Sequence, residues 1–207
     1  MNLLDSACGS PDHGITLVSW HEFRPQRHGR QSMETTLQTE RLILNRPRGE
    51  DVDAMFRILS DRRTTRHNPG DALAWREEAE GLFAHWEDQW ERHGVGYFAV
   101  RMPERPDPIG FAGVKHVLLD GRPVLNLYYR LEHRYWGNGY GTEAVRAVVV
   151  HVNELLELPP IMARVKPRNV ASAKIVAGLG FIPAPGLDLA ADDKYEDVYV
   201  LNWDRQL

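Results

Sequence analysis

Two periods of apolar residues alternate along the chain from about residue 36 onward. Short apolar-rich runs bounded by turn residues predict β-strands, whereas apolar residues spaced three or four apart predict amphipathic helices. The predicted strands are 37–46, 97–101, 109–117, 124–131, 161–165, one starting at 181, and 197–203. The predicted helices are 50–59, 72–93, one from the glycine-rich turn 137–141 to about 156, and one from Asn169 to 178–180.

The order of these elements predicts a mixed α/β fold. The Pro-rich link 103–108 and the Asp120-Gly121 turn separate the three middle strands, which therefore form an antiparallel meander. A unit of glycine turn, helix, strand, helix and strand follows. No second domain boundary appears after residue 36, so 36–207 is expected to be one domain.

The first 35 residues lack sustained periodicity and are expected to form a mobile N-terminal extension. One short apolar piece, Ile15–Trp20, is suited to pair as an edge strand or to dock on the body. Met33 stands just before the first convincing strand and is an alternative start of the protein.

Composition narrows the function classes. The 207 residues are 43% hydrophobic and 26% charged, with a formal net charge of −4. These values fit a globular protein and argue against a nucleic-acid-binding face. No apolar run reaches the length of a membrane span and no secretory signal is present, so we expect a cytoplasmic protein. The single Cys8 excludes an internal disulfide and a Cys-based zinc site, and the nine histidines show no paired ligand spacing, so no metal is expected.

The glycine-rich turn is the strongest chemical signal. Gly137, Gly139 and Gly141 remove Cβ atoms at alternate positions, so successive N–H groups can surround an anion at the positive end of the following helix. A diphosphate is the expected guest. The spacing matches neither the dinucleotide fingerprint G-x-G-x-x-G nor the P-loop.

Four motifs in order carry a family resemblance. They are Thr39-Glu40-Arg41-Leu42-Ile43-Leu44, Pro108-Ile109-Gly110-Phe111-Ala112-Gly113, Trp136-Gly137-Asn138-Gly139-Tyr140-Gly141 followed by Thr142-Glu143-Ala144, and Asn169-Val170-Ala171-Ser172 followed by Leu179-Gly180-Phe181. Over roughly 37–203 the chain resembles the GNAT superfamily of acetyl-CoA-dependent N-acetyltransferases, and more narrowly the branch with the ribosomal-protein N-acetyltransferases.

The resemblance implies a mostly antiparallel sheet, flanked by helices and splayed between its fourth and fifth strands to admit acetyl-CoA as co-substrate. Asn169 would bond the pantetheine arm; it is equally suited to be a helix N-cap after Pro167, and the two roles are compatible. The cofactor-binding residues that the resemblance implies are Tyr129, Leu131, Trp136, Gly137, Asn138, Gly139, Gly141, Thr142 and Asn169.

The implied reaction is direct attack of a neutral primary amine on the thioester. Many family members protonate the leaving thiolate with a tyrosine seven residues after the asparagine, but that position is Val176 here. Ser172 is the branch's substitute and otherwise an ordinary polar residue of a first helical turn.

The general base is less defined. The branch often has a glutamate where this sequence has Asn126, and an amide takes no proton at neutral pH. The substitutes are His116, Glu132 and His133, each of which also fits an ordinary solvated side chain. Proton transfer to solvent is the remaining route.

The resemblance implies an acceptor that is a protein N-terminus, a lysine side chain or a small amine, and a homodimer is compatible with the sequence. An acidic helix surface would attract a cationic acceptor, although a solvated helix face explains it equally well. A non-catalytic acyl-CoA-binding regulatory module and a protein that binds a partner through residues 1–35 are the alternative functions. The acidic residues are Glu77, Glu78, Glu80, Glu87, Asp88 and Glu91.

Overall fold

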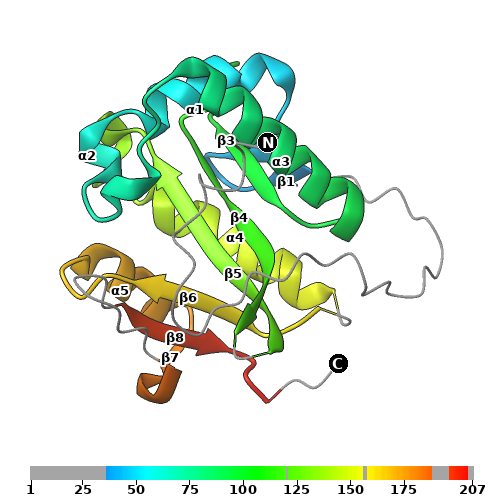
Figure 1. Ribbon diagram of the computed structural model, residues 1–207, viewed down its shortest axis with the longest axis vertical. Coiled ribbons are helices and arrows are strands. Elements are labelled where there is room, and N and C mark those ends of the chain that lie inside the picture. Colours follow the sequence, from blue (N-terminus) through cyan, green and yellow to red (C-terminus); the bar gives the residue numbers. More distant parts are fainter. Residues whose placement is uncertain (1–35, 120, 156–157, 188–195, 205–207) are drawn as a thin grey trace, which may run out of the picture.

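The computed structural model describes residues 36–119, 121–155, 158–187 and 196–204 (Figure 1). The extension 1–35, including the short apolar piece Ile15–Trp20, lies outside the described residues, so the expectations about it stay predictions.

A single mixed sheet organises the described part of the chain (Figure 1). Its strand order is β1-β2-β3-β4-β5-β6-β8-β7, and every neighbouring pair is antiparallel except β5 and β6. The expected mixed fold and the central meander are confirmed. The strands are β1 (Thr36–Gln38), β2 (Ile43–Asn45), β3 (Tyr97–Arg101), β4 (Gly110–Leu119), β5 (Arg122–Leu131), β6 (Ile161–Val165), β7 (Ile182–Pro183) and β8 (Asp197–Leu201).

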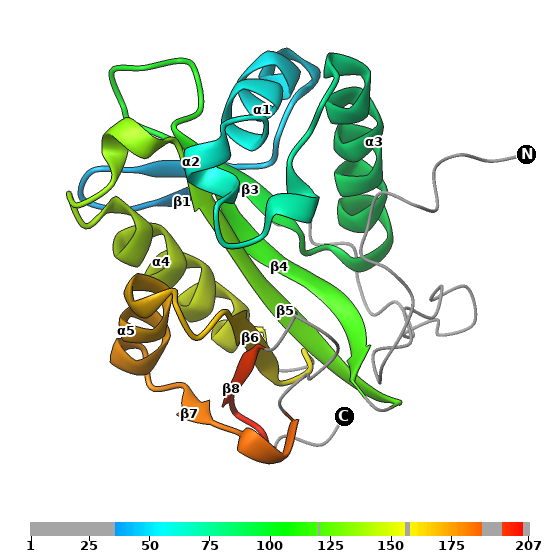
Figure 2. The ribbon, with the colours of Figure 1, turned by 60° about the vertical axis from the view of Figure 1, so that its left-hand side comes forward.

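Helices cover both faces of the sheet (Figure 2). One core cluster joins α4 and α5 to the sheet, and a second joins α1 and α3 to its other face. Because side chains alternate along a strand, odd-numbered residues of β5 such as Leu127 face α4 and α5, whereas even-numbered ones such as Tyr128 face α1 and α3. The helices are α1 (Val52–Leu59), α2 (Arg62–Thr65), α3 (Arg76–His93), α4 (Tyr140–Glu154) and α5 (Val170–Gly178).

The prediction of one strand over 37–46 is wrong. The segment forms two short antiparallel strands, β1 and β2, joined by a turn in which the Thr39 N–H donates to the Leu42 carbonyl (2.9 Å). The sequence pattern did not indicate this turn, because its polar residues Thr39 and Arg41 bond to α4, which is distant in sequence.

The long helix predicted from residue 72 begins four residues later. Trp75 is the N-cap of α3, and the Glu78 carboxylate accepts from the Ala74 N–H (2.6 Å), which fixes the start. Gly94, with φ of +68°, ends the helix as expected. The short helix α2 lacked an apolar period and was not predicted. No helix in the described ranges is long and apolar enough to cross a membrane.

Candidate active site

The parallel strands β5 and β6 separate after a short contact. They pair only at Leu125 with Ile161 and at Asn126 with Met162, and the Leu125 N–H donates to the Pro160 carbonyl (2.8 Å). Strand β5 continues to Leu131 while paired with β4 on its other side. The edge of β5 that faces β6 therefore opens from residue 127 onward, which is the splay expected between the fourth and fifth predicted strands, 124–131 and 161–165.

The glycine-rich turn lies at the wide end of this opening. Gly137 and Gly139 have φ of +78° and +80°, a region that favours glycine. Gly139 is the N-cap of α4, and its carbonyl accepts from the Glu143 N–H (3.0 Å). The first N–H groups of an α-helix lack partners within the helix. The exposed turn and the α4 N-terminus therefore fit a diphosphate.

Trp136 ties the turn to the end of β5. Its indole Nε1–H donates to the Leu131 carbonyl (2.8 Å). The guanidinium of Arg66 lies 5.1 Å from the centroid of the Trp136 ring, and the His133 ring lies 4.9 Å away. Two residues expected at the cofactor, Trp136 and Leu131, are thus joined to each other, which sets where the turn stands relative to the strand.

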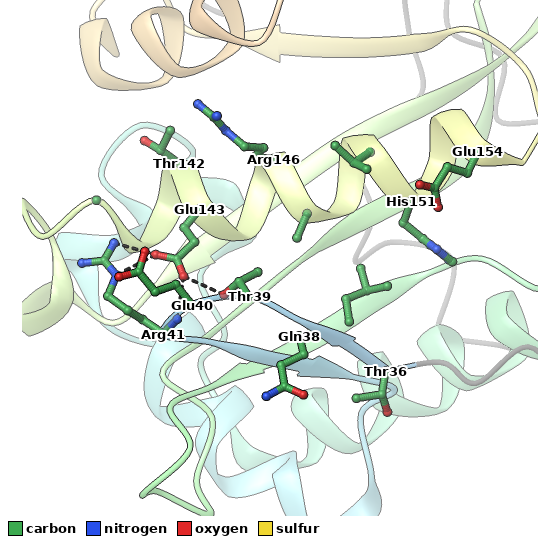
Figure 3. Close-up of a pocket in the computed structure, with 14 residues that line it drawn as sticks. Thr36, Gln38, Thr39, Glu40, Arg41, Thr142, Glu143, Arg146, His151 and Glu154 are labelled. Carbon is green, nitrogen blue, oxygen red and sulfur yellow. Dashed lines mark hydrogen bonds and ion pairs between the residues drawn. The ribbon is translucent and has the colours of Figure 1, made fainter.

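The β1–β2 turn braces the glycine-rich turn (Figure 3). Glu143, in the first turn of α4, accepts from the Thr39 hydroxyl (2.6 Å) and from the Arg41 backbone N–H (2.9 Å) and Nε (2.7 Å). Arg41 also donates through Nη1 to the Asn138 carbonyl (3.0 Å). These hydrogen bonds outweigh the effect of burial and lower the pKa of Glu143. Two of the four motifs that carry the resemblance, 39–44 and 136–144, are thus joined by hydrogen bonds, a link that sequence reasoning missed.

A groove of about 850 Å³ runs between this brace and the exposed length of α4. Figure 3 shows Thr36 and Gln38 on one side and His151 and Glu154 on the other. Gly139 and Thr142 border its end nearest the turn, whereas the opening between β5 and β6 lies elsewhere. The groove therefore borders the glycine-rich turn and is separate from the opening between β5 and β6.

A hydroxyl pair bridges the opening. The Tyr129 phenol of β5 and the Ser172 hydroxyl of α5 lie 2.6 Å apart. Asn169 is the N-cap of α5, and its Oδ1 accepts from the Ser172 N–H (3.2 Å). The capping role of Asn169 is therefore present, and its amide Nδ2 makes no hydrogen bond to another described residue. Val176, at the position of the family's tyrosine, is buried in the core.

The candidate bases are dispersed. His116 lies on β4 opposite Leu125, where β5 and β6 are still paired, and its ring centroid is 4.6 Å from that of His93. Burial, and secondarily the neighbouring His93, lowers the pKa of His116 to about 4. Such a histidine is neutral at pH 7 and a weaker base than an ordinary imidazole.

The other candidates lie beyond the end of β5. His133 is exposed beside Trp136. Glu132 is paired with Arg134 (2.9 Å) and more loosely with Arg57 (3.8 Å). The structure brings neither to the narrow end of the opening. Asn126 lies there instead, and its buried Oδ1 has no hydrogen-bond partner among the described residues.

Comparison with known proteins agrees with this geometry. The family described as "Acetyltransferase (GNAT) domain" matches residues 41–182. An uncharacterized N-acetyltransferase, p20, from Bacillus licheniformis is 28% identical over 147 residues, which are 70% of this chain and 82% of p20.

Solved structures share the fold. An acetyltransferase from Agrobacterium tumefaciens is 26% identical with a TM-score of 0.68, covering 85% of this chain and 99% of its own. The ribosomal L7/L12 alpha-N-protein acetyltransferase RimL, in complex with coenzyme A, has a TM-score of 0.67 at 13% identity, covering 80% and 97%. The family match spans more than half of the sequence, so the chain belongs to the GNAT family of N-acetyltransferases, which use acyl-CoA.

Proposed function

We propose that this protein transfers an acetyl group from acetyl-CoA to a primary amine by direct attack. The observation that carries the proposal is the opening between β5 and β6, whose wide end meets the glycine-rich turn at the start of α4. An acyl thioester on an extended arm fits this arrangement, with its diphosphate at the turn and its reactive carbon toward the narrow end.

The turn would bind the diphosphate through backbone N–H groups. The left-handed conformation of Gly137 and Gly139 supports this role, because it turns successive N–H groups toward one side. Asn138, Gly141 and Thr142 complete the set, and the positive end of α4 adds its partial charge. The free edge of β5 at Tyr129–Leu131 would pair with the amides of the pantetheine arm, and the Asn169 amide N–H₂ would donate to it.

The two proton movements would use different groups. The leaving sulfur would take a proton from Ser172, whose hydroxyl stands at the opening. The amine must lose a proton, and no carboxylate among the described residues lies where Asn126 does at the narrow end. We therefore favour release of that proton to solvent over a histidine base, since the pKa of His116 is lowered to about 4.

The acceptor would approach from the α1 and α3 side. The even-numbered residues Asn126, Tyr128 and Arg130 face that way, and Arg130 pairs with the half-exposed Asp71 (3.0 Å). The acidic residues of α3 give little support to charge attraction, since four of the six cap the helix or pair with arginines. A protein N-terminus, a lysine side chain and a small amine all stay candidates.

The test has two stages. Acetyl-CoA should raise the melting temperature of the full chain, because a ligand that binds only the folded state stabilises it. Release of free thiol should then be measured over a panel of N-terminal peptides, lysine peptides and small amines. Stabilisation without thiol release from any amine would favour a non-catalytic acyl-CoA-binding module, and absence of stabilisation would contradict the cofactor assignment.

A further inference from the structure

The hydroxyl pair of Tyr129 and Ser172 joins the two sides of the opening. Tyr129 belongs to the part of β5 that has lost its β6 partner, and Ser172 lies in the first turn of the helix that follows β6. The distance of 2.6 Å between the two oxygens is that of a good O–H···O hydrogen bond.

The Tyr129 ring stands between the glycine-rich turn and α5. A Cβ atom built on Gly141 would lie 3.6 Å from Cε2 of this ring, so the ring passes directly beside the first turn of α4. Its hydroxyl then reaches Ser172 on the neighbouring helix. The pair therefore lies on the route from the diphosphate site to the narrow end of the opening.

The protonation state of Tyr129 determines which of the two hydroxyls has a proton to donate to a third group. Burial raises the pKa of the Tyr129 phenol above its ordinary value near 10, and the hydrogen bond with Ser172 offsets part of that rise. The phenol therefore keeps its proton at neutral pH. If Tyr129 donates to Ser172, the serine's own proton is available for a third group, and Ser172 Oγ has no other hydrogen-bond partner in the described ranges.

We propose that Tyr129 is a positioning residue that orients the Ser172 hydroxyl toward the leaving sulfur. The inference rests on the proposed acetyl transfer. The phenol that many relatives supply from the helix is replaced by Val176 here, and the structure offers a phenol from strand β5 instead.

In the proposed step, protons pass from solvent through Tyr129 and Ser172 to the leaving sulfur. The amine nitrogen bonds to the thioester carbon, the C–S bond breaks, and its electron pair goes to sulfur. Sulfur takes the Ser172 proton, Ser172 takes the Tyr129 proton, and Tyr129 takes one from solvent. The amine releases its proton to solvent, so the tyrosine begins and ends protonated, which its raised pKa favours.

The kinetic test is a double-mutant cycle of Y129F and S172A in the full chain. Each single variant should lower kcat by about tenfold to a hundredfold, the low end of general-acid contributions, with KM for acetyl-CoA changed less than about twofold. The double variant should be no slower than S172A alone, because the tyrosine acts through the serine. Y199F is the matched control: Tyr199 packs against the same core cluster and should keep the wild-type kcat.

Wild-type kcat in Y129F, a change confined to KM, or effects that multiply in the double variant would each overturn the relay. A second measurement does not need turnover. The affinity for coenzyme A, measured by calorimetry from pH 7 to 9.5, should rise with pH in the wild type because the bound thiolate accepts the Ser172 hydrogen bond. The rise should weaken in both single variants but not in Y199F. The same rise in Y129F as in the wild type would refute the relay even if no acceptor is found, whereas a lack of turnover alone would count only against the proposed function.

Discussion

Gly139 offers a sharp test of the diphosphate site. Replacing it with valine places a branched side chain at φ of +80°, and left-handed backbone costs an L-residue roughly 1–2 kcal/mol, with β-branched residues the least tolerant. The new Cβ would lie 3.3 Å from the end of the flexible Arg41 side chain, which can move aside. The methyl groups would then stand among the N–H groups that face the diphosphate, and affinity for acetyl-CoA should fall at least about tenfold, or about 1.4 kcal/mol.

Gly121 provides the control for backbone strain. It has φ of +78°, immediately precedes β5 in the connection from β4, and a Cβ there would meet no atom within 4 Å. Gly121→Val should therefore lose similar stability, a few degrees of melting temperature per kcal/mol in a domain of this size, while binding acetyl-CoA as the wild type does.

Calorimetric titration at 25 °C, where both variants should stay folded, measures the two affinities. Circular dichroism of each variant verifies the fold, and thermal melts report the stability loss. Wild-type affinity in a folded Gly139→Val protein would refute the assignment of the turn. Equal loss of affinity in both variants would show that strain in the fold, rather than contact at the turn, weakens binding.

Three further changes probe the supports of the site. Glu143→Gln should weaken acetyl-CoA binding severalfold, while Glu154→Gln on the same helix should not. The folded-state pKa of Glu143 is lowered from 4.5, so its contribution to stability is present above pH 4.5 and is lost as the pH falls through the folded pKa. Chemical denaturation at pH 3–6 should therefore show a smaller loss of stability with acid in Glu143→Gln than in the wild type. Because the pKa of His116 is lowered to about 4, the wild type should lose up to about 1.4 kcal/mol of unfolding free energy per pH unit as the pH falls from 6.5 toward 4. His116→Ala should reduce that slope and leave the pH profile of kcat/KM unchanged. Asn126→Asp places a carboxylate at the narrow end and should raise kcat/KM at pH 7 more than at pH 9; a ratio to wild type that is independent of pH would contradict a proton-removal role there.

The elements with strong local signals were predictable from sequence. The Asp120-Gly121 turn, the glycines that open α4 and the clean apolar run 161–165 each define a boundary through neighbouring residues alone. Gly110 and Gly113 of the central-strand motif are explained by the adjacent strands instead: a Cβ there would come within 2.8 Å of Leu131 Cα and 2.6 Å of Tyr97 Cα, respectively. In this part of the chain, local sequence and tertiary packing favour the same structure.

The contacts that support the site were not predictable in the same way. Arg41 and Glu143 are 102 positions apart, and Tyr129 and Ser172 are 43 apart. Each of these residues belonged to a motif or a site expectation, but no periodicity relates the members of a pair. The split of 37–46 into two strands has the same origin, because Thr39 and Arg41 leave the strand direction to reach α4. Single-sequence patterns report which face a residue occupies, and long-range partners follow only from the assembled sheet.

The alternation of side chains along β5 gives the proposed chemistry a spatial order. Tyr129 and its neighbours at odd positions face α5, where the leaving sulfur would take its proton, whereas Asn126 and Tyr128 face the opposite side, where the amine would lose one. The titrations of a proton donor and a proton acceptor would be coupled if the two side chains lay on the same face at hydrogen-bonding distance. Burial raises the pKa of the Tyr129 phenol, and its place on the opposite face from Asn126 would keep it apart from the route of the amine proton. The two proposed proton movements would therefore not depend on each other, so an amide at Asn126 on one face is compatible with the Tyr129–Ser172 hydroxyl pair on the other.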